Sequence, residues 1–180
     1  MDFKTCSLED VFLIEPRLFQ DERGYFLETF RQSLIEKFTG PISFVQDNKS
    51  KSQKGVFRGL HFQKPPRAQA KLVQCVKGKI LDIALDLRKN SKTCGKFEVF
   101  ELSSENHHSL FIPIGFAHGF LALEDETVVH YKTSDYYCPD SESGIHIDSI
   151  TYDWPIPRAV WNLSPKDQIL PGLDEVFWFE

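Results

Sequence analysis

Residues 80–88 read ILDIALDLR, and this stretch decides the class of fold. The apolar residues at the odd positions 81–87 alternate with Asp82, Asp86 and Arg88. A period of two places the two sets of side chains on opposite faces of a β-strand. The pattern therefore predicts a strand from Ile80 to Arg88 with one strongly apolar face.

Short apolar runs of the same kind lie on both sides of this strand, separated by turn signals such as Lys77-Gly78-Lys79. Many short strands punctuated by glycine and proline are typical of a β-sandwich or barrel. We therefore expect a mostly β fold with a few short helices. The further predicted strands are Leu72–Val76, Phe97–Leu102, Leu110–Ile112, Phe120–Leu123 and Val128–Lys132.

One helix is predicted from Arg31 to Phe38, because Phe30, Leu34 and Phe38 recur every four residues and Gly40-Pro41 stops the pattern. The tail from Ser164 is expected to be loop with a short aromatic segment at Val176–Phe179. The chain has no internal repeat and no linker-like stretch. We expect residues 1–180 to form one domain.

The composition limits the classes of partner. Of 180 residues 41% are hydrophobic, the formal net charge is −5, and no basic run stands out, so we expect no nucleic-acid partner. The four cysteines form no CxxC pair, which favours a reducing cytosol over a disulfide scaffold. The first residues lack the apolar stretch of a signal peptide, and no run is long enough for a membrane helix. We expect a cytoplasmic protein without a membrane partner.

The densest polar cluster is GVFRGLHFQ at residues 55–63. Strict alternation places Arg58 and His61 on opposite faces, so both can face one site only if the strand bulges near Gly59. A half-exposed strand with a surface histidine is the alternative interpretation. Lys71, at the start of an apolar strand, is either an edge lysine or a fixed cation at the mouth of the barrel.

The segment PIGFAHG at residues 113–119 matches half of a metal-binding cupin signature. The other half requires HxH followed by a carboxylate, but the sequence at His61 is His-Phe-Gln, and His107 and His108 are adjacent. A metal site needs three or four converging ligands. We therefore expect a cupin-type barrel without a metal; a metal-dependent cupin is the alternative from another class, as is a non-catalytic sugar-binding barrel.

Seven motifs, in order along nearly the whole chain, resemble the dTDP-4-dehydrorhamnose 3,5-epimerase family. They are FQDERGYFLE at residues 19–28, QDN at 46–48, GVFRGLHFQ at 55–63, QAKLV at 69–73, DLR at 86–88, IPIGFAHGF at 112–120, and YK at 131–132 with KD at 166–167. The resemblance implies a cupin-type jelly roll, usually a homodimer, that acts without a cofactor on a nucleotide-linked 4-keto-6-deoxy sugar.

The resemblance also implies roles for individual residues. His61 is the expected general base, Asp167 its paired carboxylate, Tyr131 the acid on the other face of the sugar, and Lys71 the cation near the developing oxyanion. The expected substrate-binding residues are Arg23, Glu28, Gln46, Asn48, Arg58, His118, Tyr137, Glu142 and Lys166, with Tyr137 stacking on the base.

This chemistry is reasonable in itself. A ketone at C4 acidifies both C3 and C5, and a neutral histidine suits proton abstraction at neutral pH. A carboxylate on the other ring nitrogen fixes the tautomer, and a placed lysine stabilises the enolate. No hydride moves, which agrees with the lack of a GxGxxG motif.

Three positions depart from the family pattern. Lys49 replaces a frequent histidine, Ala70 replaces a common glycine, and a usual tryptophan is missing after ESGI at 142–145. These departures leave a second hypothesis open. It is an epimerase of C3 alone or C5 alone, or one acting on a GDP-, CDP- or UDP-linked sugar, including a heptose.

Overall fold

The predicted strand at 80–88 is present in the computed structural model, which describes all 180 residues, as β8 (Lys79–Asp86). The strand ends two residues earlier than predicted. Its last residue, Asp86, accepts hydrogen bonds from the backbone N–H and the guanidinium of Arg88, which folds that residue back. The polar face predicted from the alternation is not on the surface, because Asp82 and Asp86 are fully buried.

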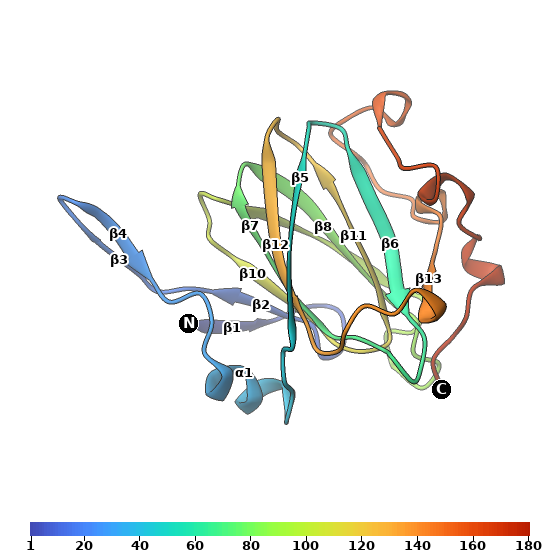
Figure 1. Ribbon diagram of the computed structural model, residues 1–180, viewed down its shortest axis with the longest axis horizontal. Coiled ribbons are helices and arrows are strands. Elements are labelled where there is room, and N and C mark those ends of the chain that lie inside the picture. Colours follow the sequence, from blue (N-terminus) through green and yellow to red (C-terminus); the bar gives the residue numbers. More distant parts are fainter.

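Two antiparallel sheets face each other and form the body of the molecule (Figure 1). This confirms the predicted mostly β, cupin-like fold. The first sheet contains, in spatial order, β1 (Asp2–Thr5), β2 (Phe12–Glu15), β10 (Ser109–Ile112), β7 (Lys71–Lys77), β12 (Thr127–Thr133) and β5 (Gln46–Ser52). The second contains β13 (Glu142–Gly144), β6 (Phe57–Gln63), β11 (Phe116–Ala122), β8 and β9 (Phe97–Ser103).

The single α-helix and a separate hairpin complete the N-terminal half. Helix α1 (Gln32–Thr39) begins one residue after the predicted start, since Arg31 has extended backbone, and Gly40 ends it as predicted. The hairpin, which the sequence did not reveal, pairs β3 (Leu18–Asp21) with β4 (Gly24–Leu27). Strand β11 begins four residues before the predicted Phe120, so His118 lies within it.

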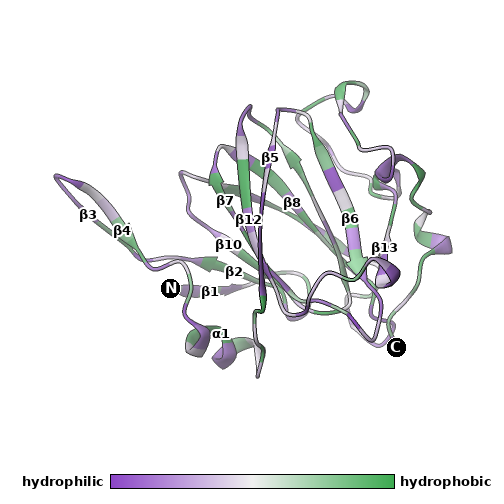
Figure 2. Cartoon of the chain, viewed as in Figure 1, coloured by the Kyte–Doolittle hydropathy of each residue, from purple (hydrophilic) through white to green (hydrophobic).

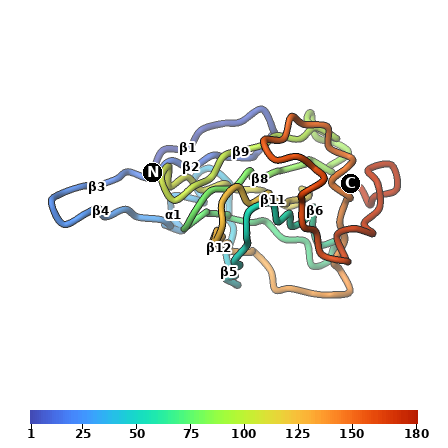
Figure 3. Tube along the Cα trace, turned by 90° about the horizontal axis from the view of Figure 1, so that it is seen from above, coloured from blue at the N-terminus to red at the C-terminus, as the bar shows by residue number.

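The chain after β13 is mostly irregular, and this includes the tail from Ser164, which was predicted to be loop. Its short 3₁₀ turns are η1 (Pro139–Ser141), η2 (Ile147–Ser149), η3 (Arg158–Val160), η4 (Asp167–Ile169) and η5 (Leu173–Glu175). The aromatic end is tied to the body by a bridge between Arg88 and Phe179. Figure 3 shows that this segment lies on the side of the molecule opposite the β3–β4 hairpin.

Two hydrophobic cores lie on the two sides of the second sheet. One fills the space between the sheets and contains Ile80, Ala84, Phe120 and Val129. The other packs Leu81, Ile83, Leu85 and Leu87 against the C-terminal segment, through side chains such as Trp161, Leu163 and Phe179. Because the tail covers the outer face of this sheet, it is held close to β6, next to the short edge strand β13.

Strand β6 carries a bulge near Gly59, which was the condition for Arg58 and His61 to face one site. His118 pairs with His61 and Phe120 pairs with Arg58, so β6 advances three residues while β11 advances two. Gly59 has a φ of 123°, and a Cβ there would lie 2.6 Å from the Cα of Gly119. The extra residue turns Arg58 and His61 toward the same side of the strand.

The β3–β4 hairpin projects from the body (Figures 1 and 3). Its tip is hydrophilic (Figure 2), yet Phe19, Tyr25 and Phe26 are all at least half exposed. Exposed aromatics on a projecting element are typical of a contact surface. Separately, no helix of this fold has the length and apolar content to span a membrane.

Candidate active site

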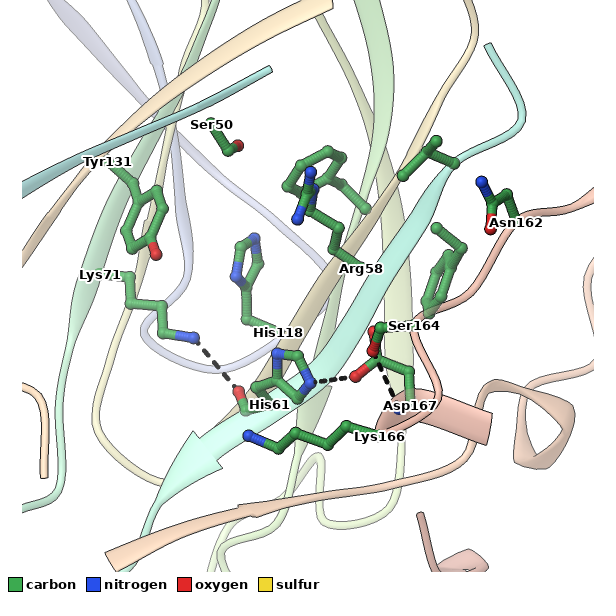
Figure 4. A pocket seen from close by; sticks show the side chains of 13 residues that line it. Ser50, Arg58, His61, Lys71, His118, Tyr131, Asn162, Ser164, Lys166 and Asp167 are labelled. Carbon is green, nitrogen blue, oxygen red and sulfur yellow. Dashed lines mark hydrogen bonds and ion pairs between the residues drawn. The ribbon is translucent and has the colours of Figure 1, made fainter. Parts of the chain in front are cut away.

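Two cavities open between the sheets and meet at three side chains. The larger, about 450 Å³, lies between β6, β11 and the C-terminal segment, and the smaller, about 280 Å³, lies between β5, β7 and β13. His61, Lys71 and Tyr131 line both. The three residues expected to meet the sugar ring are therefore at the junction of the two spaces (Figure 4).

His61 is oriented by Asp167. The Nε2 atom of His61 lies 2.6 Å from Oδ1 of Asp167, which is the buried first residue of η4. Burial raises the pKa of Asp167, but the hydrogen bond and charge of His61 outweigh it, so the pKa is lowered overall. Because an ionised carboxylate only accepts, Nε2 bears the proton and Nδ1 has the free lone pair.

Asp167 is itself held by a local turn. Its backbone N–H donates to the Oγ of Ser164 at 3.1 Å, and its Oδ2 accepts from the backbone N–H of Gly59 at 3.5 Å. The carboxylate therefore reaches His61 across 106 residues of sequence because the tail is packed on the second sheet.

Lys71, at the start of β7, places its ammonium beside β6. Its Nζ donates to the backbone oxygen of His61 at 3.2 Å and makes no ion pair. Burial lowers the pKa of Lys71 to about 8, while the charges of Asp82 and Glu142 act against this shift. The ammonium keeps free N–H donors for an oxygen that gains negative charge in the cavity.

Tyr131 enters from the other sheet. It lies on β12, and Figure 4 shows its hydroxyl directed into the cavity, across from His61 on β6. Burial raises the pKa of Tyr131; the charge of Arg58 lowers it and that of Glu142 raises it. The phenol is thus protonated at neutral pH and can serve as an acid.

Cations and carboxylates surround this centre. Arg58 is held at the rim by hydrogen bonds from its guanidinium to the Oγ of Ser52 at 3.0 Å and to the backbone oxygen of Lys51 at 3.1 Å. Across the mouth, Glu142 accepts from the ammonium of Lys166 at 2.5 Å and from the hydroxyl of Tyr137 at 2.6 Å. Burial raises the pKa of Glu142, but these two donors lower it overall.

The smaller cavity is lined by amide side chains. The Nε2 atom of Gln46 donates to Oδ1 of Asn48 at 2.9 Å, and its Oε1 accepts from the backbone N–H of Tyr137. Tyr137 lines this cavity with its ring half exposed, so a planar ligand can reach it. His118 lines the larger cavity instead.

Arg23 and Glu28 are the two expected site residues that this chain does not bring to the cavities. Arg23 is at the tip of the hairpin with its side chain 85% exposed and paired with Asp21. Glu28 follows the hairpin and pairs with Arg31.

Five residues in or beside the cavities were not among the expected site residues. Ser50, Asn162 and Ser164 line the larger cavity, and Gln63 anchors the backbone of the loop that bears Tyr137, accepting from Cys138 at 2.7 Å. Asp82 pairs with His118 at 2.9 Å. The sequence offers one signal for these residues. Asp82 is a carboxylate within an otherwise apolar strand, a feature that it shares with Asp86.

The arrangement suits the removal of a proton from one face of a ring carbon and the return of a proton on the opposite face. Enolate chemistry needs a base with a fixed tautomer, a phenol on the opposite sheet and an ammonium donor, and the site contains all three. No three His, Cys, Asp or Glu side chains converge as a metal site.

Comparison with known proteins agrees with this geometry. Residues 5–175 match the family model described as dTDP-4-dehydrorhamnose 3,5-epimerase. The Escherichia coli K12 protein of that name is 50% identical over 179 residues, covering 98% of this chain and 96% of the relative.

Two solved structures extend the likeness to the fold. The dTDP-4-dehydrorhamnose 3,5-epimerase of Elizabethkingia anophelis superposes with a TM-score of 0.93 at 46% identity, covering 97% of each chain. The dTDP-6-deoxy-D-glucose-3,5-epimerase of Legionella pneumophila, solved with dTDP-4-keto-L-rhamnose, superposes with a TM-score of 0.92 at 40% identity, covering 98% of this chain and 94% of that one.

Proposed function

This chain belongs to the dTDP-4-dehydrorhamnose 3,5-epimerase family of isomerases, and from that premise we propose that it inverts C3 and C5 of a dTDP-linked 4-keto-6-deoxy sugar without a cofactor. The observation that supports this most is the meeting of His61, Lys71 and Tyr131 at the junction of two cavities. A sugar ring at this point has a base on one face and an acid on the other.

In the first step, Nδ1 of His61 takes the proton from a carbon next to the ketone. The C–H electrons move into the ring and onto the C4 oxygen, which forms an enolate. The hydrogen bond from Nε2 to Asp167 stabilises the imidazolium that results. The ammonium of Lys71 donates to the enolate oxygen where the charge grows.

In the second step, the hydroxyl of Tyr131 gives a proton to the same carbon from the opposite face. The enolate electrons return to form the new C–H bond, and the carbon is inverted. His61 then loses its proton to solvent and the phenolate regains one, so the overall reaction is balanced without an oxidant or reductant. The ketone acidifies both neighbours, so one set of groups serves C3 and C5 in turn.

The nucleotide diphosphate requires local cations on a chain of net charge −5. Arg58 and Lys166 line the larger cavity and supply them. Tyr137 and the amides of Gln46 and Asn48 line the smaller cavity, where a base can stack and form hydrogen bonds.

A homodimer explains the placement of Arg23 and Glu28. Both lie on or next to the projecting hairpin, away from the cavities of their own chain. In a two-fold dimer, a hairpin that leaves one body reaches the other. Its exposed Phe19 and Phe26 then become buried, and Arg23 adds a third cation to the partner's phosphate site.

The test is incubation of the purified protein with dTDP-4-keto-6-deoxy-D-glucose in heavy water, followed by proton NMR. The proposal predicts deuterium at C3 and C5 and a product with both carbons inverted. Parallel reactions use the GDP- and CDP-linked sugars, which we expect to react far more slowly. Deuterium at one carbon alone would identify a single-site epimerase, and exchange at neither carbon would refute the proposal.

A further inference from the structure

A second histidine–carboxylate pair lies next to His61 and Asp167, and the reaction proposed above leaves its carboxylate without a role. His118 on β11 is the register partner of His61 on β6. Its Nε2 lies 2.9 Å from Oδ2 of Asp82 on β8, the next strand of the same sheet. His61, His118 and Asp82 therefore lie on three neighbouring strands, while Asp167 reaches His61 from the tail.

Asp82 is not explained by folding alone. It is 0% exposed, and its Oδ1 has no hydrogen-bond partner. A buried carboxylate with an unused oxygen destabilises a fold. Asp86, equally buried on the same strand, differs in that Arg88, Ser91 and Thr93 all donate to it.

Lys71 is a nearby cation that makes no ion pair, and its ammonium donates only to the backbone oxygen of His61. The charged and titratable groups that surround it are Arg58 and His61 from β6, Asp82 from β8, His118 from β11, Tyr131 from β12, Glu142 from β13, and Lys166 and Asp167 from the tail.

Two of these three carboxylates are already engaged. Asp167 accepts from His61, and Glu142 accepts from Lys166 and Tyr137. Asp82 accepts from His118 alone and its second oxygen has no partner, and its charge favours the protonated form of Lys71 more than that of Glu142 does.

We propose that Asp82 is a positioning residue of the epimerase: it accepts the Nε2–H of His118 and supplies the buried negative charge that complements the ammonium of Lys71 without contacting it. This inference rests on the proposed function and deepens it. A direct ion pair would occupy the donors of Lys71 and cancel the charge that the enolate oxygen needs. A carboxylate beyond contact distance preserves both.

The same arrangement sets the tautomer of His118. With the proton on Nε2, the other ring nitrogen is an acceptor. Nδ1 has no protein partner, and His118 lines the larger cavity. His118 thus offers the sugar an acceptor for a hydroxyl, while Lys71 offers it donors.

The test compares Asp82→Asn with Asp86→Asn, a matched loss of a fully buried carboxylate on the same strand. The pKa of Lys71 is measured by NMR titration of protein labelled with ¹³C at the lysine ε-carbons, and Lys71→Arg identifies the signal. We expect Asp82→Asn to lower the pKa of Lys71 below its value of about 8 and Asp86→Asn to leave it in place. Epimerisation by Asp82→Asn should lose rate above neutrality and approach the wild-type rate near pH 6.

The size of the effect follows from the titration. A pKa lower by one leaves about a third as much ammonium at pH 7.5, so the rate there falls about threefold. Asp86→Asn should lower the melting temperature without moving the alkaline limb. If Asp82→Asn does not fold, Asp82→Ser removes the same charge from a smaller side chain and has the same expected shift.

An unchanged pKa of Lys71 in the Asp82 variant, or an equal shift in both variants, would overturn the proposal. A wild-type protein that epimerises nothing would refute the proposed function instead, and the NMR titration would still measure the coupling of Asp82 to Lys71.

Discussion

The two proton transfers are assigned to two residues on opposite sheets. His61 belongs to the second sheet and Tyr131 to the first, and both line the two cavities. In Tyr131→Phe, the base remains but the acid is lost. We expect inversion to fall by about 10²–10⁴-fold, while His61 still exchanges the substrate proton with deuterium on its own face. Proton NMR in heavy water separates labelled substrate from product; loss of exchange equal to the loss of inversion would assign both steps to Tyr131.

The ammonium of Lys71 sets the alkaline limit of the reaction. Burial lowers its pKa to about 8, so the cation is present below this pH and is lost above it. The rate of epimerisation should therefore decline as pH rises through about 8. Lys71→Arg keeps a cation at all these pH values, so its rate, although lower, should show no decline there. A pH–rate profile of both proteins checks this, and a shared alkaline limb would exclude Lys71 as its source.

At the scale of elements, the bulge in β6 connects sequence to site. Arg58 and His61 are three residues apart, so strict alternation places their side chains on opposite faces of the strand. If both face one site, the strand must contain an extra residue near Gly59, as it does. The alternation in β8 likewise predicted its two faces. It could not show that the polar face is interior, because that depends on the tail covering the apolar face.

Gly59→Ala tests the bulge against a matched control, Gly24→Ala. Both glycines have nearly the same positive φ, 123° and 125°, but a Cβ at Gly24 meets nothing within 4 Å, whereas one at Gly59 lies 2.8 Å from the backbone oxygen of His118. We expect Gly59→Ala to lose about 3 kcal/mol of stability and Gly24→Ala only about 1 kcal/mol. Urea unfolding measures both, and equal losses would argue against close packing at the bulge.

At the scale of the whole molecule, the ordered motifs supplied a set of candidate site residues. They did not show where each of these residues lies in the fold. Most of them line the cavities, but Arg23 and Glu28 do not, since Arg23 lies at the tip of the hairpin and Glu28 directly follows it. The hairpin was not predicted because its aromatic side chains are exposed and belong to none of the three hydrophobic cores. A hairpin that packs on no core has no buried face to produce a clear apolar alternation.

Mixing two inactive variants tests the dimer. If Arg23 acts on the partner's site, a mixed dimer of Arg23→Ala and His61→Asn contains one intact site. After the variants are unfolded and refolded together, about a quarter of wild-type activity should return. Light scattering should give twice the chain mass. A monomer, or a mixture as inactive as its components, would place Arg23 outside the partner's site.

The rate of deuterium exchange at C3 and C5 in His61→Asn, compared with wild type, tests most directly whether His61 is the base. Asparagine is polar but has no basic nitrogen, and its side chain ends short of the Nε2 position that contacts Asp167. His146→Asn, at a histidine outside both cavities, is the control and should exchange like wild type. We predict that His61→Asn abolishes exchange at both carbons while the variant still binds dTDP. Exchange at the wild-type rate at either carbon would contradict it.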